Sequence, residues 1–228
     1  MRLDKLLSHL NCGSRKEVQA LIRAGRVSVD GTVQKDPAFK VDPDRSQTAV
    51  DGTVQRYRAQ RYYMLNKPMG VITASRDERH DTVLELFPAE LRRGLFAVGL
   101  LLITDDGALS HALMSPNRHV EKEYEAVVDG VLAADAVLRF EQGMTLRDGT
   151  ECKPAKLEIL ETEPELRVRV TLKEGKYHQV KRMVAAVGGT VTALKRLRLG
   201  GLWLDKTLAP GEFRELTQEE LEKLTSQT

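Results

Sequence analysis

The chain has 228 residues, of which 41% are hydrophobic and 30% charged, with a formal net charge of +2. This composition is typical of globular proteins, and the length suits a small domain followed by a larger one. No run approaches the roughly 18 consecutive apolar residues of a membrane-spanning helix, and the N-terminus lacks the apolar stretch of a signal peptide. Cys12 and Cys152 stand outside any metal-ligand spacing. We therefore expect a soluble, cytoplasmic protein with no metal and no disulfide framework.

Basic charge is concentrated in two stretches of the chain. Residues 1–58 contain 11 basic and 7 acidic residues, and residues 173–198 contain seven basic residues and one acidic residue. Concentrated positive charge is typical of proteins that bind a polyanion. A nucleic-acid partner is therefore a candidate, although the net charge alone does not indicate one.

The first 34 residues predict two amphipathic helices and a hairpin. Leucines at 3, 6, 7 and 10 form one apolar stripe, and Ser14 with Glu17 forms the pattern of a capping box that opens a second helix. Gly25 suits the position just after that helix. Asp30-Gly31 between valines predicts a tight hairpin turn. The polar stretch 42–61 suits a domain boundary near residue 60.

This stretch resembles the small RNA-binding module shared by a small-subunit ribosomal protein and tyrosyl-tRNA synthetases. The polar side of the second helix carries Lys16, Gln19, Arg23 and Arg26. On spacing alone, this stripe could equally be a solvated helix face. The resemblance implies RNA contacts, mostly to phosphates, at Arg2, Lys5, Ser14, Arg15, Lys16, Arg23 and Arg26.

The remainder of the chain predicts strands with a few helices between them. Short apolar or alternating runs at 62–65, 100–104, 123–128, 166–172 and 191–199 are typical of strands, and 177–187 has helical spacing. Thr217 and Glu220 form a second capping-box pattern before a final helix. We expect an α+β protein: a small helical and hairpin domain at 1–60, then a larger domain at 61–228 built on a mainly antiparallel mixed sheet.

Four segments of this larger domain resemble the RsuA-like family of ribosomal RNA pseudouridine synthases. They are YYMLNKPMGVITA at 62–74, GLLLITDDGALSHALMSP at 99–116, HVEKEYEAVV at 119–128 and LKEGKYHQVKRMVAAVGGTV at 172–191. The resemblance implies isomerisation of one uridine to pseudouridine without a cofactor. It favours 16S ribosomal RNA within an assembly intermediate as the partner, and a monomeric enzyme with no membrane partner. The alternatives are a 23S RNA substrate and an inactive factor that only binds ribosomal RNA.

The resemblance also assigns roles to individual residues. Tyr124 matches the tyrosine that packs on the flipped base, and Lys181 matches the basic partner of the catalytic aspartate, with Arg182 as the second choice. The alternatives are a core tyrosine and a solvated basic helix start. We expect Tyr124 and Lys181 to face one cleft. Further expected RNA contacts are Lys67, His178, Gln179 and Arg182, and the strand carrying Lys195, Arg196 and Arg198 is expected to bind RNA backbone.

The family's nucleophile is missing from this chain. The family pattern runs Gly-Arg-Leu-Asp, continues through Thr to Gly and then enters an apolar strand, whereas here Val98-Gly99 leads directly into Leu100. Asp105 and Asp106 match the family's turn after the strand and do not replace the nucleophile, which is expected between Val98 and Leu100. Three explanations stay open: a loop omitted from the printed sequence, an engineered deletion and a natural loss.

Overall fold

The computed structural model describes residues 1–10, 12–55, 60–74, 77–99, 101–115 and 118–226. These residues form two compact units, one made of 1–60 with 88–93 and the other of 61–87 with 94–228. The short segment at 88–93, which contains α3 (Ala89–Arg92), groups with the first unit, although the sequence had assigned it to the second domain. Within the described part of the chain, no helix is long and apolar enough to cross a membrane.

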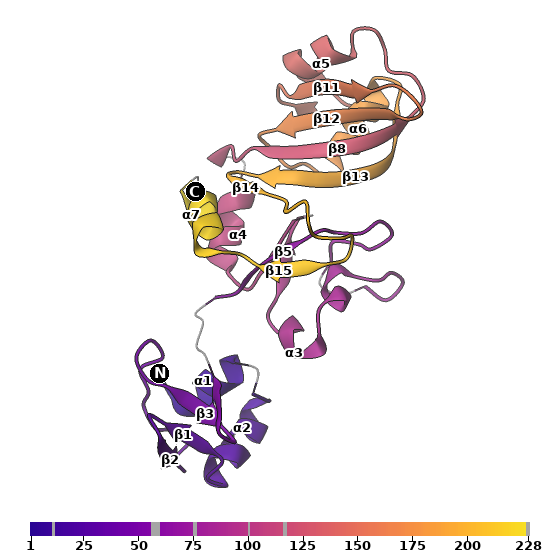
Figure 1. The fold of residues 1–228 in the computed structure, drawn as a ribbon. Helices are drawn as coiled ribbons and strands as arrows, with labels where there is room; N and C mark the ends of the chain where they lie inside the picture. The colour runs from indigo at the N-terminus through magenta and orange to yellow at the C-terminus, as the bar shows by residue number, and fades with distance from the viewer. Residues whose placement is uncertain (11, 56–59, 75–76, 100, 116–117, 227–228) are drawn as a thin grey trace. The chain divides into compact units, whose positions relative to one another are not determined.

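The first unit packs two helices against a four-stranded antiparallel sheet (Figure 1). The helices are α1 (Leu3–His9) and α2 (Arg15–Arg23), and the capping box of Ser14 and Glu17 is present. The leucines of α1 and the apolar side of α2 are buried in a common core. The strands, in the spatial order β2-β1-β3-β4, are β1 (Val27–Val29), β2 (Thr32–Gln34), β3 (Thr48–Val50) and β4 (Thr53–Gln55).

Two similar turns close the hairpins of this sheet. Asp30 and Gly31 have φ of 50° and 77°, and Asp51 and Gly52 have φ of 50° and 78°. Positive φ at both central residues is the mark of the type I′ turn, which matches the twist of the paired strands. The first hairpin was predicted from the sequence. The second was not, because the polar stretch around it suggested only a boundary.

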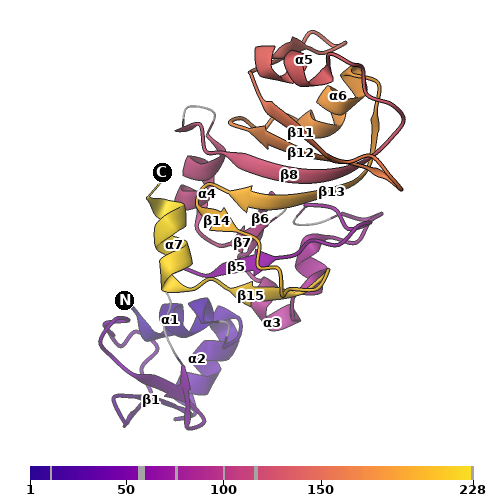
Figure 2. The same cartoon turned by 45° about the horizontal axis from the view of Figure 1, so that its top comes forward.

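The second unit contains a five-stranded antiparallel sheet with helices on one face (Figures 1 and 2). Its order is β11-β12-β8-β13-β14, with β8 (Lys122–Asp129) between β12 (Leu166–Leu172) and β13 (Thr190–Leu199). β11 (Lys156–Glu161) and β14 (Leu202–Trp203) are the edges. The helices α5 (Ala136–Gln142) and α6 (Gln179–Ala186) cover one face of the sheet and share its core. A two-stranded hairpin, β9 (Met144–Thr145) with β10 (Glu151–Cys152), follows α5.

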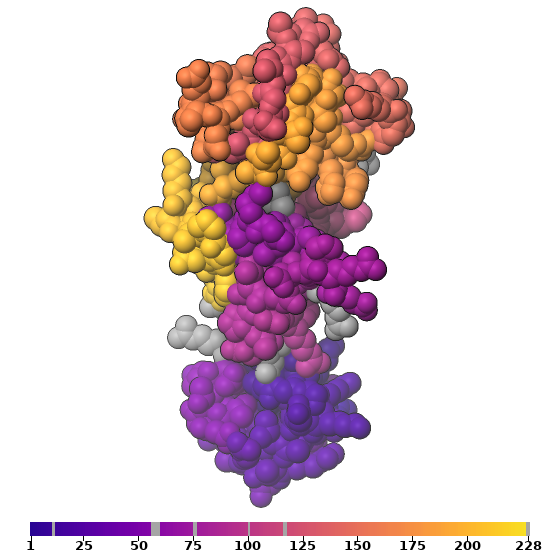
Figure 3. Space-filling view, turned by 90° about the vertical axis from the view of Figure 1, so that its right-hand side faces the viewer, coloured from indigo at the N-terminus to yellow at the C-terminus, as the bar shows by residue number. Residues whose placement is uncertain are grey.

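A four-stranded sheet completes the second unit. Its order is β15-β5-β7-β6, from β15 (Phe213–Glu215), β5 (Tyr62–Leu65), β7 (Leu102–Thr104) and β6 (Phe96–Val98). The space-filling view shows the C-terminal segment, in yellow, against the purple segment that contains β5 (Figure 3). The helices α4 (Gly107–Met114) and α7 (Gln218–Thr225) pack against one set of apolar residues of this sheet. The short helix η1 (Val83–Leu86) packs against a second set, which includes Tyr63, Leu65 and Ile103.

The predicted α+β architecture is confirmed, with differences at the ends of elements. The strand expected from residue 100 begins at Leu102, and Leu100 lies outside the described residues. The helix expected over 177–187 begins at Gln179, after His178 in a left-handed conformation. The alternation at 166–172 corresponds to β12, in which Val168, Val170 and Leu172 are buried.

Candidate functional site

A buried arginine and a buried tyrosine lie side by side at the centre of the five-stranded sheet. Tyr124 on β8 is paired directly with Arg196 on β13. Arg196 Nη2 donates a hydrogen bond to the Tyr124 hydroxyl at 2.6 Å, and the guanidinium carbon lies 5.0 Å from the ring centroid. Tyr124 is 6% exposed and Arg196 5%. The tyrosine that the sequence placed at an open cleft is therefore enclosed, with its hydroxyl held by a cation.

The same arginine contacts the turn in which the nucleophile was expected. Its Nη1 donates to the carbonyl oxygen of Val98 at 3.2 Å. Gly99 has φ of 72°, and a Cβ atom there would lie 2.2 Å from Arg196 Nη1, so a side chain would force the guanidinium away. Arg196 Nε is buried and has no hydrogen-bond partner within the described residues. The junction therefore contains a buried cation with an unused donor.

A second buried cation lies close to Arg196. Lys122 is 1% exposed, and its Nζ donates to the carbonyl oxygens of Val120 at 3.0 Å and Leu113 at 3.4 Å. Burial, together with the charge of Arg196, lowers the pKa of Lys122 to about 8. Among the residues that the structure describes, neither cation has a carboxylate partner. An acidic group at this place would relieve the repulsion between them.

Lys181 and Lys67 form a second, more accessible pair of cations. Lys181 is exposed on α6, whereas Lys67 follows β5, is half-buried and donates to the carbonyl oxygen of Pro68 at 3.0 Å. Burial and the nearby charge of Lys181 lower the pKa of Lys67. Lys181 is exposed and Tyr124 enclosed, and the expectation that both face one cleft stays a prediction. The expected nucleophile position ends at Leu100, outside the described residues.

Two expected RNA contacts at the start of α6 are engaged within the protein. Gln179 is 3% exposed, its Nε2 donates to Glu174 Oε1 at 2.5 Å, and its Oε1 accepts from the Lys176 amide. The expectation that Gln179 contacts RNA is therefore not supported by its burial. Arg182 forms an ion pair with Asp148 and donates to Thr150 Oγ1 at 3.0 Å. His178, by contrast, is exposed.

The basic strand β13 also differs from its expected role. Arg196 is enclosed, as described above, and Arg198 Nη2 forms ion pairs with Glu121 at 2.9 Å and Glu123 at 3.6 Å. Only Lys195 of the three basic residues is exposed. The prediction of a strand that binds RNA backbone with all three side chains is corrected accordingly: two of them hold the protein together.

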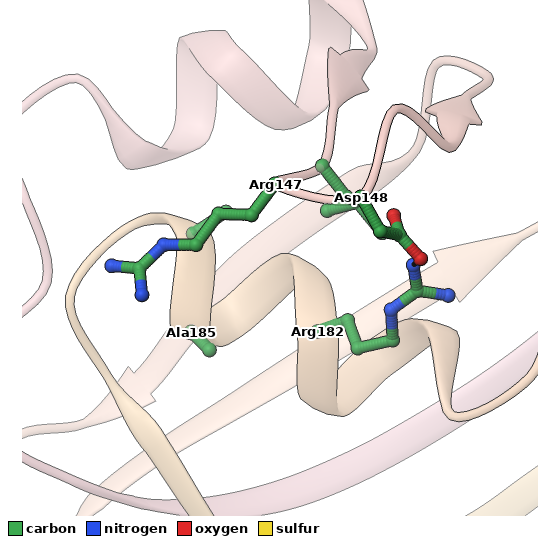
Figure 4. Close-up of a pocket in the computed structure, with 6 residues that line it drawn as sticks. Arg147, Asp148, Arg182 and Ala185 are labelled. Atoms are coloured by element: carbon green, nitrogen blue, oxygen red, sulfur yellow. Dashed lines mark hydrogen bonds and ion pairs between the residues drawn. The ribbon is translucent and has the colours of Figure 1, made fainter.

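A hollow of about 270 Å³ opens beside α6, lined by Leu146, Arg147, Asp148, Arg182, Ala185 and Ala186. The close-up shows Arg182 turned toward Asp148, whereas Arg147 extends along the other side (Figure 4). Neither Tyr124 nor Lys181 lines this hollow. The hollow is thus a surface feature separate from the buried cations.

The basic surface of the first unit is organised by a buried aspartate. Asp4 is fully buried and accepts hydrogen bonds from Arg2 at 3.0 Å and from Gln19 at 2.9 Å, with Arg15 at 3.6 Å. Bonding to Arg2 is the main cause that lowers the pKa of Asp4 to about 2. Arg26 forms an ion pair with Asp51 at 2.5 Å.

The remaining basic side chains of this surface are exposed and have no acidic partner within the described residues. They are Lys5, Lys16 and Arg23. Ser14 is also exposed, although its hydroxyl accepts the Glu17 amide at 3.4 Å. Three cations on α1 and α2 are therefore available to a polyanion.

Known proteins with similar sequences cover nearly the whole chain. Residues 1–45 match the model of the S4 domain, and residues 61–186 match that of RNA pseudouridylate synthase. The chain is 45% identical to an uncharacterized RNA pseudouridine synthase of Bacillus subtilis, covering 98% of each. It is 41% identical to ribosomal small subunit pseudouridine synthase A of Escherichia coli, covering 97% of this chain and 98% of that protein. A crystal structure of a pseudouridylate synthase matches with a TM-score of 0.67 and 33% identity, covering 98% of this chain and 99% of that one.

The enclosed hydroxyl of Tyr124 leads to a first prediction. Tyr124→Phe leaves a buried guanidinium donor without its acceptor, and we expect the free energy of unfolding to fall by about 1–3 kcal/mol. Urea denaturation measures the change. Tyr177→Phe is the matched control, because Tyr177 is 77% exposed and removal of its hydroxyl should hardly change the free energy of unfolding. Equal stability of Tyr124→Phe and wild type would contradict the bond.

The buried Asp4 leads to a second prediction. The pKa of Asp4, about 2 in the folded protein, lies below the ordinary value of 3.8, so its stabilising contribution is complete above pH 4 and is lost as the pH falls through 2. Asp4→Asn should therefore lower the thermal midpoint at neutral pH, and the gap to wild type should narrow between pH 4 and 2. Asp44→Asn, at an exposed position, serves as control. A gap that stays constant with pH argues against this role.

Proposed function

The chain belongs to the RNA pseudouridylate synthase family, and from this premise we propose that, with a nucleophilic carboxylate in place after Val98, it isomerises one uridine of 16S ribosomal RNA to pseudouridine. The observation that carries the proposal is the match, over nearly the full length of both chains, to ribosomal small subunit pseudouridine synthases of several bacteria, including Yersinia pestis at 42% identity. The S4 match at residues 1–45 supplies a module suited to hold the RNA. We also propose that the enzyme acts in the cytoplasm, as a monomer, on an assembly intermediate of the small subunit.

The reaction requires the target base to leave the RNA stack. Uracil is detached from its ribose, rotated and rejoined through carbon, and extrusion of the base costs a few kcal/mol. We assign to Tyr124 the stacking contact with the flipped base, since base–aromatic stacking is worth about 1–3 kcal/mol. The Arg196 guanidinium occupies one side of this ring at 5.0 Å from its centroid. A base that stacks on this ring therefore displaces Arg196 or the core side chains that pack around it.

The nucleophilic carboxylate belongs, in this proposal, between Val98 and Leu100. The match to the Bacillus protein extends over 234 residues, more than the 228 of this chain, so the relative has residues that stand opposite gaps here. The uncompensated cations Lys122 and Arg196 are suited to a carboxylate inserted at this junction, because opposite charge favours its ionised form. Lys181, with Lys67 beside it, is exposed and is assigned to the surface that faces the RNA, and its role as the basic partner of the carboxylate stays a prediction.

A second candidate function is RNA binding without catalysis. The observation that favours it is the absence of the family's aspartate from the sequence around Gly99. This candidate predicts salt-dependent binding to ribosomal RNA without turnover. The two candidates differ in what happens when a carboxylate is returned to the junction.

The experiment compares the 228-residue chain with a variant that carries an eight-residue Gly-Arg-Leu-Asp-type insertion after Val98. Pseudouridine is mapped by chemical probing on 16S and 23S RNA, free and in assembly intermediates. We expect no pseudouridine from the 228-residue chain and one modified 16S uridine from the variant with the insertion. An otherwise identical insertion with Asn at the Asp position is the control and should be inactive.

Other outcomes of this experiment decide between the alternatives. Modification of 23S RNA alone would replace the proposed substrate. An inserted variant that folds, binds 16S RNA and makes no product would favour the binding factor. If the inserted variant neither binds nor modifies either RNA, the proposed function is refuted.

The free cations of the first unit give a prediction for binding. Lys16→Ala and Arg23→Ala should each weaken binding to 16S RNA, and each should reduce the salt slope by about one unit, because each removes a phosphate contact. The measurement is filter binding at several salt concentrations. Arg45→Ala is the control, since Arg45 is exposed on the same unit but lies outside the stripe. Unchanged slopes for Lys16→Ala and Arg23→Ala would make the stripe a solvated face.

A further inference from the structure

An aromatic pair stands exposed immediately before α6. Tyr177 is 77% exposed, the most exposed of the large aromatic side chains in the described residues. Its ring stacks on that of His178 with 3.9 Å between centroids and 22° between planes. Burial does not explain an aromatic ring at this position, because most of its surface is in water. Because the two rings cover each other, the stack offers the outer face of a ring to a ligand.

The backbone that presents these rings is held in an unfavourable conformation. His178 has φ of 47° and ψ of 34°, in the left-handed region that residues other than glycine rarely adopt. Conformations of this kind persist only where the surroundings enforce them. Here Arg182 Nη1 donates to the carbonyl oxygen of Tyr177 at 3.2 Å.

A buried polar network fixes the other side of the same turn. Glu174 is 6% exposed, and its carboxylate accepts from Gln179 Nε2 and lies 3.6 Å from Lys176 Nζ. Gln179 in turn accepts from the Lys176 backbone amide at 3.0 Å. Gln179, which the sequence suggested as an RNA ligand, thus helps to position the turn, and the rings of Tyr177 and His178 are what the turn presents.

Positive charge accompanies the aromatic face. Lys181 is exposed one helical turn after Tyr177, and Lys67 is close enough to Lys181 for their charges to interact. Within the described residues, neither lysine forms an ion pair with a carboxylate. A flat aromatic face beside unpaired cations suits a nucleotide, which offers a base to stack and a phosphate to neutralise.

We infer that Tyr177 and His178 form a stacking platform for an unpaired base of the RNA substrate, separate from the base that is isomerised. The inference rests on the proposed function, because it presupposes an RNA ligand. The platform recognises the face of the base and not its edge, so it tolerates all four bases. It contributes affinity at the start of α6, whereas the neighbouring lysines contribute the salt-dependent part of binding.

The test measures binding of the 228-residue wild-type chain and its variants to a 16S RNA transcript. Tyr177→Ala should raise the Kd by about 5-fold to 150-fold, the equivalent of 1–3 kcal/mol of lost stacking. Its salt slope should stay at the wild-type value, because no phosphate contact is removed. Lys181→Ala should instead reduce the slope. Tyr177→Phe should bind like wild type.

A spectroscopic readout tests stacking directly. Single-stranded RNA that carries 2-aminopurine should lose fluorescence on binding wild type and retain more of it with Tyr177→Ala. His178→Asn removes the second ring and introduces a residue that tolerates the left-handed backbone. Its loss of 2-aminopurine fluorescence should lie between those of wild type and Tyr177→Ala. Ile159→Ala is the control for loss of an exposed apolar side chain, since Ile159 is 49% exposed on the edge strand β11.

The outcomes separate this inference from the proposed function. If wild type binds 16S RNA and Tyr177→Ala binds equally well with the same thermal midpoint, the platform is refuted and the proposed function stands. If wild type binds no ribosomal RNA, the proposed function fails, and quenching of the 2-aminopurine oligonucleotide then decides whether the platform exists. Equal weakening by Ile159→Ala would also refute a specific role for Tyr177.

Discussion

The guanidinium of Arg196 connects the two sheets of the second unit. It donates to Tyr124 on β8 of the larger sheet and to the carbonyl oxygen of Val98 at the end of β6 in the smaller one. A buried cation without a counter-ion is costly, and here a second one, Lys122, lies nearby with its pKa lowered. The glycine at 99 and the enclosure of the Tyr124 hydroxyl both follow from this one charge.

Much of the fold could be predicted because its signals are local. The leucine stripe of α1, the capping box of α2 and the Asp-Gly hairpin turn each lie within a few residues of sequence. The alternation of apolar and polar residues along β12 is an equally local signal. The second hairpin carries the same Asp-Gly signal at Asp51-Gly52, but its strands have only three residues each and few apolar side chains. Polar composition outweighed the turn signal there, so the sheet of the first unit was only half predicted.

The candidate site was harder to predict because its residues are defined by partners far away in sequence. Arg196 and Arg198 look alike in the sequence, and a register shift between them interrupts the alternation that would sort inward from outward side chains. Gln179 is polar and follows an exposed turn, yet Glu174 draws it inside. Asp4 similarly holds Arg2 and Arg15, which the sequence offered as free cations. Residue type identified the chemistry, but only three-dimensional pairing shows which charges remain free.

The pairing of β15 with β5 sets an order for folding during synthesis. β5 is the first strand of the second unit, at Tyr62–Leu65, and its neighbour β15 is the last, at Phe213–Glu215. The smaller sheet therefore stays incomplete until some 150 further residues have left the ribosome, whereas the paired strands β1 to β4 lie within the first 55 residues. Because domains fold as units in the order of their synthesis, a nascent chain has its first sheet formed while β5 still lacks its outer partner. The backbone donors and acceptors along the edge of β5 that will pair with β15 stay unpaired until then.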